Sequence, residues 1–411
     1  MPPTSLPTYN TAQLVAFFDH IRLPPSHRIF DLKSASLDPI STLRYLALLQ
    51  KLTLVSVPFE NLSLHYKESH NVDIDPQVLW DKVVGRGLRE QAADEGKEML
   101  EHVVIQQDER ESRKRKWQAG RGGYCMENNC FFGTILRSIG FDVYSVGARV
   151  KSPDGYGGWS HMVNLVTIHP RIYHVDIGFG GGGPTHPLPL LDPNPATNNH
   201  LTVGTQTSYP YLASPHTPTN THIRLVHRSL TEDEAPTARK QGDTTQALWV
   251  YEMRKGNSSA VLSGGGAGTE GAATSKDQEQ EGVWEPQYAF STLEFLPQDF
   301  EIMNLYTSTS PRIWFTQKIV CTRFLLEGED GSCLPDEIGD KDEKRLVDGK
   351  IVGQMILNQD VVKRRIGDRS DVVEEGKTEE ERVRALRKWF GIRLTEGEKK
   401  GIRGLVSQLS G

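Results

Sequence analysis

The sequence is poor in cysteine, with four cysteines in 411 residues. They are Cys125, Cys130, Cys321 and Cys333, and none of them forms a CxxC pair. So few thiols in a chain of this length exclude the disulfide framework of a small secreted protein, and the missing CxxC pairs exclude the common zinc signatures. The composition predicts a reduced, cytoplasmic setting, in which one well-placed cysteine can serve as a nucleophile.

The sequence also lacks any apolar run of the roughly 20 residues that a membrane-spanning helix needs. Its first residues, MPPTSLPTYNTAQL, have neither the basic start nor the apolar stretch of a secretory signal. The formal net charge of -6 gives no general attraction to nucleic acid or to anionic membranes. We therefore expect neither nucleic acid nor a membrane among the partners, and the sequence leaves the oligomeric state open.

Several catalytic signatures are missing as well. The sequence has no GxxxxGK[ST] phosphate loop and no HExxH motif, and we expect no metal site. The stretch GFGGGGP at 178–184 follows a strand-like run, but no helical pattern comes after it, which argues against a dinucleotide-binding fold. Its backbone N–H groups could still approach phosphates.

The first part of the chain reads as helical. Apolar residues recur at helical spacing in 11–21, 41–57 and 76–84. Asp75 is a plausible N-cap, with Pro76 at the first helical position. Near the other end, residues 377–394 have the pattern of an amphipathic helix that ends near Gly391.

Between these helical parts, strand-like runs alternate with turns at 221–230, 246–254, 287–295 and 318–328. A charged stretch at about 87–118 reads as a mostly solvated insertion, with one helix at most. Two further insertions, at about 191–220 and 256–282, have the composition of loops. The expected order is helices first, then a β-rich middle, then a mixed C-terminal part.

The segment RGGYCMENNCFFGTILRSIG places Cys125 directly before a helical pattern. Apolar residues recur from Met126 to Ile139, and Gly140 is expected to end the helix. A thiol in the first turn experiences the helix dipole and free backbone N–H groups, which favour a thiolate and could stabilise an oxyanion beside it. The alternative is that Cys125 is a small buried hydrophobic residue, as expected for Cys130 on the apolar stripe.

A thiolate nucleophile needs a nearby histidine, and the histidine needs an orienting carboxylate. Two strand-like runs, HMVNLVTI and RIYHVDI, offer His161 and Asp176. A two-residue turn at 169–170 makes their side chains diagonal neighbours on one face, and a four-residue loop at 167–170 places them directly opposite each other. A three-residue loop puts them on opposite faces, so the hairpin permits the contact without requiring it.

Three other residues compete for these roles: His169, His174 and Asp142. His169 lies in the expected turn, where a solvated position is typical. His174 is the stronger rival, because it lies on the same strand face as Asp176. The residues alone therefore leave more than one histidine and carboxylate open.

Taken together, several ordered motifs resemble the arylamine N-acetyltransferase family. The segment RGGYCMEN at 121–128 is similar to the family pattern RGGxCxExN, and VPFENL precedes it at 57–62. The segment VDIGFG follows at 175–180, with PxxPLxL at 184–190. Residues 288–311, YAFSTLEFLPQDFEIMNLYTSTSP, resemble the entry to the family's third domain.

The resemblance implies an α+β protein with the three-domain fold of that family and a papain-like Cys-His-Asp triad. A helical bundle would span 1–140 and contain the charged insertion. A β-barrel would span 141–290 with the two loop insertions, and an α/β lid with a C-terminal helix would span 291–411.

The resemblance also implies roles for individual residues. Cys125 would be the nucleophile, His161 the general base and Asp176 the orienting carboxylate. Arg121 and Glu127 would brace the turn before the helix.

Substrate contacts are implied in the same way. Phe59 would line the acceptor pocket. Gly157, Gly158 and the glycine loop that begins with Gly180 and Gly181 would lie near coenzyme A. No metal and no permanently bound cofactor is implied, and acetyl-CoA or malonyl-CoA would be the acyl donor.

The implied activity is ping-pong transfer of an acetyl or malonyl group, through an acyl-cysteine, to an aromatic amine, hydroxylamine or hydrazine in xenobiotic detoxification. The same residue types also serve papain- or transglutaminase-like cysteine hydrolases, and a non-catalytic binding module could keep the fold. The sequence departs from the family pattern at Met126, often aromatic in the family, and in its insertions, which resemble those of filamentous-fungal members. Arg149 is a candidate partner for a malonyl carboxylate, the alternative being a strand-end arginine that pairs elsewhere.

Overall fold

The computed structural model describes residues 5–86, 120–191, 209–211, 221–240, 242–254, 283–333, 340–367 and 369–410. The predicted charged insertion at 87–118 lies outside the described residues. The predicted insertion at 256–282 and most of the one at 191–220 also lie outside the described residues.

The N-terminal part is helical, as predicted. Its helices are α1 (Thr11–His20), α2 (Leu32–Ala35), α3 (Pro39–Ser56), α4 (Ser63–Tyr66) and α5 (Pro76–Trp80), with short helical turns η1 (Pro25–His27) and η2 (Asp81–Gly85). The predicted cap of α5 is confirmed, because the Asp75 carboxylate accepts from two backbone N–H groups of its first turn, at 2.9 and 3.2 Å. Pro76 is the first residue of that helix.

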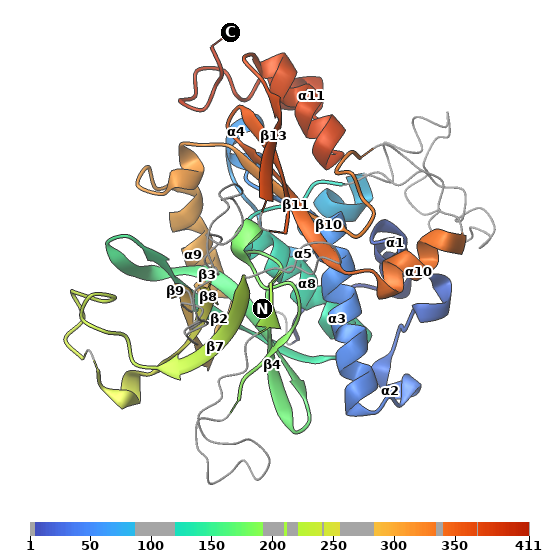
Figure 1. Cartoon of the computed structure of the whole chain (residues 1–411), viewed down its shortest axis with the longest axis vertical. Coiled ribbons are helices and arrows are strands. Elements are labelled where there is room, and N and C mark those ends of the chain that lie inside the picture. Colours follow the sequence, from blue (N-terminus) through green and yellow to red (C-terminus); the bar gives the residue numbers. More distant parts are fainter. Residues whose placement is uncertain are drawn as a thin grey trace, which may run out of the picture.

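Helix α8 (Cys125–Ile139) follows the glycine turn. It ends at Gly140, whose φ of 99° lies in the left-handed region that favours glycine. In Figure 1, α8 lies near the centre of the molecule, with strands β2 and β3 beside it. The predicted start and end of this helix are both confirmed.

The larger sheet has eight antiparallel strands in the order β5-β4-β3-β2-β9-β8-β7-β6. The strands are β2 (Asp142–Ser152), β3 (Gly155–Ile168), β4 (Arg171–Val175), β5 (Leu188–Pro189), β6 (Tyr209–Pro210), β7 (His222–Arg228), β8 (Leu248–Arg254) and β9 (Trp284–Glu294), with the turns η3 (Gly180–Gly182) and η4 (Thr244–Gln246) between them. The sheet curls, so that its two ends meet: the Thr185 hydroxyl, just before β5, donates to the Tyr211 carbonyl, just after β6, at 2.8 Å.

The smaller sheet has five antiparallel strands: β1 (Phe59–Glu60), β10 (Val320–Leu326), β11 (Ile351–Asn358), β12 (Val361–Ile366) and β13 (Arg369–Glu375). The helical elements of this part are α9 (Pro297–Thr309), η5 (Trp314–Thr316), α10 (Asp340–Asp348), α11 (Glu379–Phe390) and α12 (Glu396–Lys399). Strand β1 comes from the N-terminal part but pairs with β10, so the first and last parts of the chain are joined by backbone hydrogen bonds. The predicted C-terminal helix is α11, and Gly391 caps it with a positive φ.

In the described part of the chain, three hydrophobic clusters hold these layers together. The largest lies between the N-terminal helices, α8 and the eight-stranded sheet, and a second lies between the five-stranded sheet and α11. The third surrounds Cys125 and contains mostly aromatic and methionine side chains: Phe59, Leu64, Val72, Tyr124, Met126, Met162, Phe300 and Met303. The predicted domain limits remain a prediction, although β9 continues to Glu294, past the expected limit at 290. Among the described residues, no helix is long and apolar enough to cross a membrane.

Replacing Gly140 by alanine is expected to lower the free energy of unfolding by about 1–2 kcal/mol, because a residue with a Cβ is strained at a left-handed φ. An added Cβ would meet no atom closer than 3.5 Å, so the loss would come from the backbone conformation. Chemical denaturation would measure it. Gly158→Ala is the matched control, since a Cβ there meets nothing within 4 Å and the φ is not left-handed. Equal losses in the two variants would contradict this explanation.

Candidate active site

Cys125 is the first residue of α8, and its side chain is almost fully buried in the third hydrophobic cluster. Its sulfur lies 3.6 Å from the carbonyl oxygen of Ser160 on β3. The segment after β4 passes directly over this first turn, and a Cβ on Gly178 would come within 2.8 Å of the Cys125 Cα. Gly178 therefore allows that segment to lie against the backbone of the candidate nucleophile.

His161 and Asp176 meet beside this turn. Strands β3 and β4 pair with Ile168 opposite Arg171, which is the two-residue turn among the alternatives that the sequence left open. Nε2 of His161 lies 2.8 Å from Oδ2 of Asp176, and both side chains are buried. The structure thus brings Cys125, His161 and Asp176 to one place.

The Asp176 carboxylate accepts four hydrogen bonds. Oδ2 binds His161 Nε2 and the Tyr288 hydroxyl, each at 2.8 Å. Oδ1 binds Asn129 Nδ2 at 2.8 Å and the Gly178 N–H at 2.7 Å. Burial alone would raise the pKa of Asp176, but its interactions with His161, His174 and Asn129 lower it to about 2. The carboxylate is therefore ionised and can only accept hydrogen bonds.

The charge of His161 is set by its two partners. Burial alone would lower the pKa of His161, because it penalises the charged imidazole. Asp176 and Cys125 outweigh burial, through their charges and hydrogen bonds, and raise the pKa to about 10. At neutral pH His161 is an imidazolium, with Nε2 on Asp176 and Nδ1 available to the Cys125 sulfur.

Asn129 is a residue of this site that the sequence reasoning missed. Besides its bond to Asp176, its Nδ2 donates to the Met162 carbonyl at 2.6 Å, and its Oδ1 accepts from the Ile177 N–H at 3.0 Å. It follows Cys125 by four residues, so one face of α8 presents both side chains. That spacing is the signal that could have identified it. Gln50 on α3, also missed, donates to the Asp176 and Pro184 carbonyls at 3.4 and 3.2 Å.

The three rival residues take no part in the contact between His161 and Asp176. His169 is exposed in the turn, and Asp142 is exposed at the start of β2. His174 is buried, and its Nε2 lies 2.9 Å from the Tyr288 hydroxyl. The Cys130 thiol donates to the Ile74 carbonyl at 3.3 Å, and burial raises its pKa to about 12, which suits a buried hydrophobic residue.

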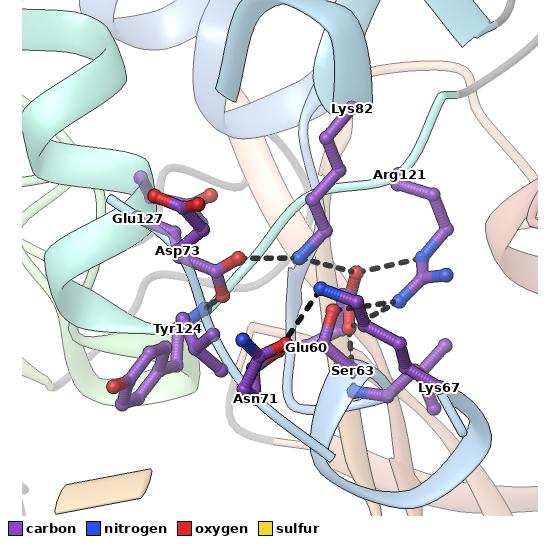
Figure 2. A network of polar contacts seen from close by, with 12 residues as sticks. Glu60, Ser63, Lys67, Asn71, Asp73, Lys82, Arg121, Tyr124 and Glu127 are labelled. Carbon is purple, nitrogen blue, oxygen red and sulfur yellow. Dashed lines mark hydrogen bonds and ion pairs between the residues drawn. The ribbon is translucent and has the colours of Figure 1, made fainter. Parts of the chain in front are cut away.

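A buried network of charges braces the turn before Cys125 (Figure 2). Arg121 donates through Nε to Glu60 at 2.8 Å, and Lys82 lies 2.6 Å from Glu127 and 3.7 Å from Glu60. Glu127 in turn accepts from the backbone N–H of Tyr124 at 3.1 Å. Burial alone would raise the pKa of Glu60, but Arg121 and Lys82 hold it below its usual value. The predicted bracing positions of Arg121 and Glu127 agree with these contacts.

The brace extends to the C-terminal part of the chain. Glu398 on α12 accepts from Arg121 at 2.8 Å and from both terminal nitrogens of Arg86 at 2.7 Å. Arg86 directly precedes residues 87–119, and Arg121 closely follows them. One carboxylate therefore holds both flanks of that stretch.

The predicted substrate residues lie in two places. Phe59 on β1 is in the cluster around Cys125, and Gly180 packs against its ring, where a Cβ would come within 2.9 Å. The Gly181 carbonyl accepts from Gln354 at 2.8 Å, which ties the glycine loop to the smaller sheet. Gly157 and Gly158 are exposed on β3 with open space around them.

Arg149 makes local contacts. Its guanidinium lies 4.2 Å from the centre of the Trp159 ring and donates to the Gly157 carbonyl at 3.0 Å. These contacts favour the structural alternative for Arg149. Among the described residues, no group of three or more His, Cys, Asp or Glu side chains could hold a metal ion.

Arg121→Met is expected to lower the free energy of unfolding by about 3–5 kcal/mol, because it leaves the Glu60 carboxylate with fewer partners in a buried site. Urea denaturation would measure this loss. Arg384→Met is the matched control: its pair with Glu381 is exposed and 3.7 Å long, and a loss within about 0.5 kcal/mol is expected. A similar loss in both variants would show that the buried network is not the cause.

Asp176→Asn is expected to lower the pKa of His161, since Asp176 is the largest influence that raises it. The imidazole would then lose its charge near neutral pH, and the rate at which iodoacetamide alkylates Cys125 at pH 7 would fall about tenfold or more. Asp142→Asn, at an exposed position, should leave the rate unchanged. An unchanged rate in Asp176→Asn would contradict this account of the His161 charge.

Comparisons with known proteins place this chain in a family. The family model described as N-acetyltransferase matches residues 95–249 and 266–331. N-malonyltransferase FDB2 of Fusarium pseudograminearum is 33% identical and covers 96% of this chain and 93% of its own. N-malonyltransferase FDB2 of Gibberella moniliformis is 30% identical over 96% of this chain and 92% of its own.

Solved structures share the fold. The arylamine N-acetyltransferase of Nocardia farcinica superposes with a TM-score of 0.57 at 21% identity, covering 99% of this chain and 100% of that one. The arylamine N-acetyltransferase of Mycobacterium marinum in complex with CoA gives 0.56 at 19% identity, with 96% and 99% covered. The predicted α+β fold class is confirmed, and this chain belongs to the arylamine N-acetyltransferase family of acyltransferases.

Proposed function

We propose that this chain transfers an acyl group from acyl-coenzyme A to an aromatic amine, hydroxylamine or hydrazine through an acyl-cysteine on Cys125. The observation that carries the proposal is the buried contact of His161 and Asp176, 2.8 Å long, beside the first turn of α8. An imidazolium next to a sulfur at a helix N-terminus is the environment that stabilises a thiolate. The comparisons support acyl transfer over the cysteine-hydrolase and binding-module alternatives, because the matched relatives and structures are named as transferases.

In the first half-reaction, the Cys125 thiolate attacks the thioester carbonyl carbon of the acyl donor. The negative charge moves to the carbonyl oxygen, near backbone N–H groups of the first helical turn that have no partner within the helix. The tetrahedral intermediate collapses as the bond to the coenzyme A sulfur breaks. His161 gives its Nδ1 proton to the departing thiolate, and Asp176 holds the ring through Nε2.

In the second half-reaction, the amine nitrogen attacks the carbonyl carbon of the acyl-cysteine. His161, now neutral, takes a proton from the attacking nitrogen, and the bond to the Cys125 sulfur breaks. The thiolate and imidazolium return together. The apolar cluster around Cys125, with Phe300 and Met303 of α9, would keep water from the thioester between the two steps.

The donor is proposed from the relatives. Both relatives described above, which match nearly the whole chain, are named N-malonyltransferases, and this supports malonyl-CoA as a donor beside acetyl-CoA. We also propose detoxification of aromatic amines as the physiological role, which follows from the family. The low cysteine content supports a cytoplasmic setting for it.

Purified protein mixed with malonyl-CoA or acetyl-CoA, without amine, should gain one acyl mass in intact-mass spectra. Cys125→Ala should gain none. Cys130→Ala should behave as the wild type, because the Cys130 thiol lies away from the triad and donates to the Ile74 carbonyl. Addition of an aromatic amine should discharge the adduct, and the donor with the faster adduct formation identifies the preferred substrate.

The steady-state kinetics check the same scheme. Double-reciprocal plots at several amine concentrations should give parallel lines. Intersecting lines, or no adduct from either donor on folded protein, would overturn the two-step acyl-cysteine mechanism.

A further inference from the structure

His174 is a second buried histidine close to the candidate triad. It lies on β4, and Asp176 directly follows the last residue of that strand. It has no exposed surface, and its ring stacks on Phe290 of β9 with centroids 4.8 Å apart. The ring of Tyr251 on β8 lies parallel at 6.3 Å. Burial of the polar ring nitrogens in such an aromatic environment costs free energy unless they are hydrogen-bonded.

One ring nitrogen of His174 is hydrogen-bonded, through the Tyr288 hydroxyl, toward Asp176. His174 Nε2 lies 2.9 Å from the Tyr288 hydroxyl, and the same hydroxyl lies 2.8 Å from Asp176 Oδ2. Tyr288 has a single hydroxyl proton. Because the ionised Asp176 can only accept, that proton points to Asp176, and the Tyr288 oxygen must accept from His174.

This assignment fixes the tautomer of His174. The proton is on Nε2, and Nδ1 has no hydrogen-bond partner within the part of the chain that the structure describes. Burial is the main cause that lowers the pKa of His174, to about 4, so the ring stays neutral at neutral pH. The charged and titratable groups that face it are Asp176, His161, Tyr251 and Tyr288.

We propose that His174 is a positioning residue that acts through Tyr288: its Nε2–H holds the Tyr288 hydroxyl in the orientation that donates to Asp176. His174 then donates to Tyr288, and Tyr288 donates to Asp176, which also accepts from His161. Asp176 Oδ2 is shared between His161 and Tyr288, so a fixed Tyr288 proton also fixes the direction in which His161 is held. The inference deepens the proposed function, because it concerns the same His161 and Cys125.

A double-mutant cycle tests the proposal. His174→Phe removes the donor but keeps an aromatic ring, and it should lower the rate of Cys125 alkylation at pH 7 by about threefold to tenfold, the range of one buried hydrogen bond. His174→Gln retains an N–H donor at similar reach and should recover most of that rate. In a Tyr288→Phe background, His174→Gln and His174→Phe should have no further effect, because the hydroxyl through which His174 acts is gone.

A matched control separates this role from the general cost of replacing a buried histidine. His186 is half-buried with its ring 5.2 Å from that of Tyr209, and burial lowers its pKa to about 4. No hydrogen bond joins it to Asp176 among the described residues, so His186→Phe should leave the alkylation rate near that of the wild type. The melting temperature of each variant would identify any that fails to fold.

Equal effects of the His174 substitutions with and without the Tyr288 hydroxyl would overturn the proposal, as would failure of Gln to recover the rate in a folded protein. Alkylation needs no coenzyme A. The test therefore stands even if no acyl adduct forms, and failure of the proposed acyl transfer is distinguished from failure of this inference.

Discussion

A single buried carboxylate determines how the parts of this protein meet. Asp176 is fully buried, and an ion without solvent is stable only if its oxygens are paired. Its partners come from separate elements: Asn129 from α8, His161 from β3 and Tyr288 from β9, in addition to the local Gly178 N–H. Hydrogen bonds to this one charged group therefore hold α8 and strands β3 and β9 of the curled sheet in position relative to one another.

The turn before Cys125 depends on a second set of buried charges. Glu60 follows Phe59 in β1, which pairs with β10, and its carboxylate faces Arg121 and Lys82. The turn is thus held by the hydrophobic cluster on one side and by ion pairs on the other. Rigid support of this kind suits a site in which sulfur, imidazole and carboxylate must stay within hydrogen-bond reach.

Local patterns predicted a large part of this arrangement. The helix from Cys125 to Ile139, its end at Gly140 and the capped helix after Asp75 follow from short-range rules of spacing and capping, and the structure has all of them. The hairpin was predicted only as a set of registers, because His169 and Pro170 fit loops of different lengths. Which register forms is decided by packing of the whole sheet. Tyr288 could not be predicted from spacing, since 112 residues separate it from Asp176.

The family motifs supplied what periodicity could not. The fold class and the family are confirmed, whereas the domain limits and the roles of the glycines remain predictions. Composition predicted insertions at about 87–118, 191–220 and 256–282; the first and the third, and most of the second, lie outside the described residues.

The double grip of Glu398 has a consequence for the evolution of this chain. By bonding Arg86 and Arg121, it fixes the chain on both sides of residues 87–119. The position at which the chain enters α8 is therefore set by Arg121 and Glu398, a few residues before Cys125. A change in the number of residues between Arg86 and Arg121 would leave these two contacts, and with them the register of the chain that enters α8, in place.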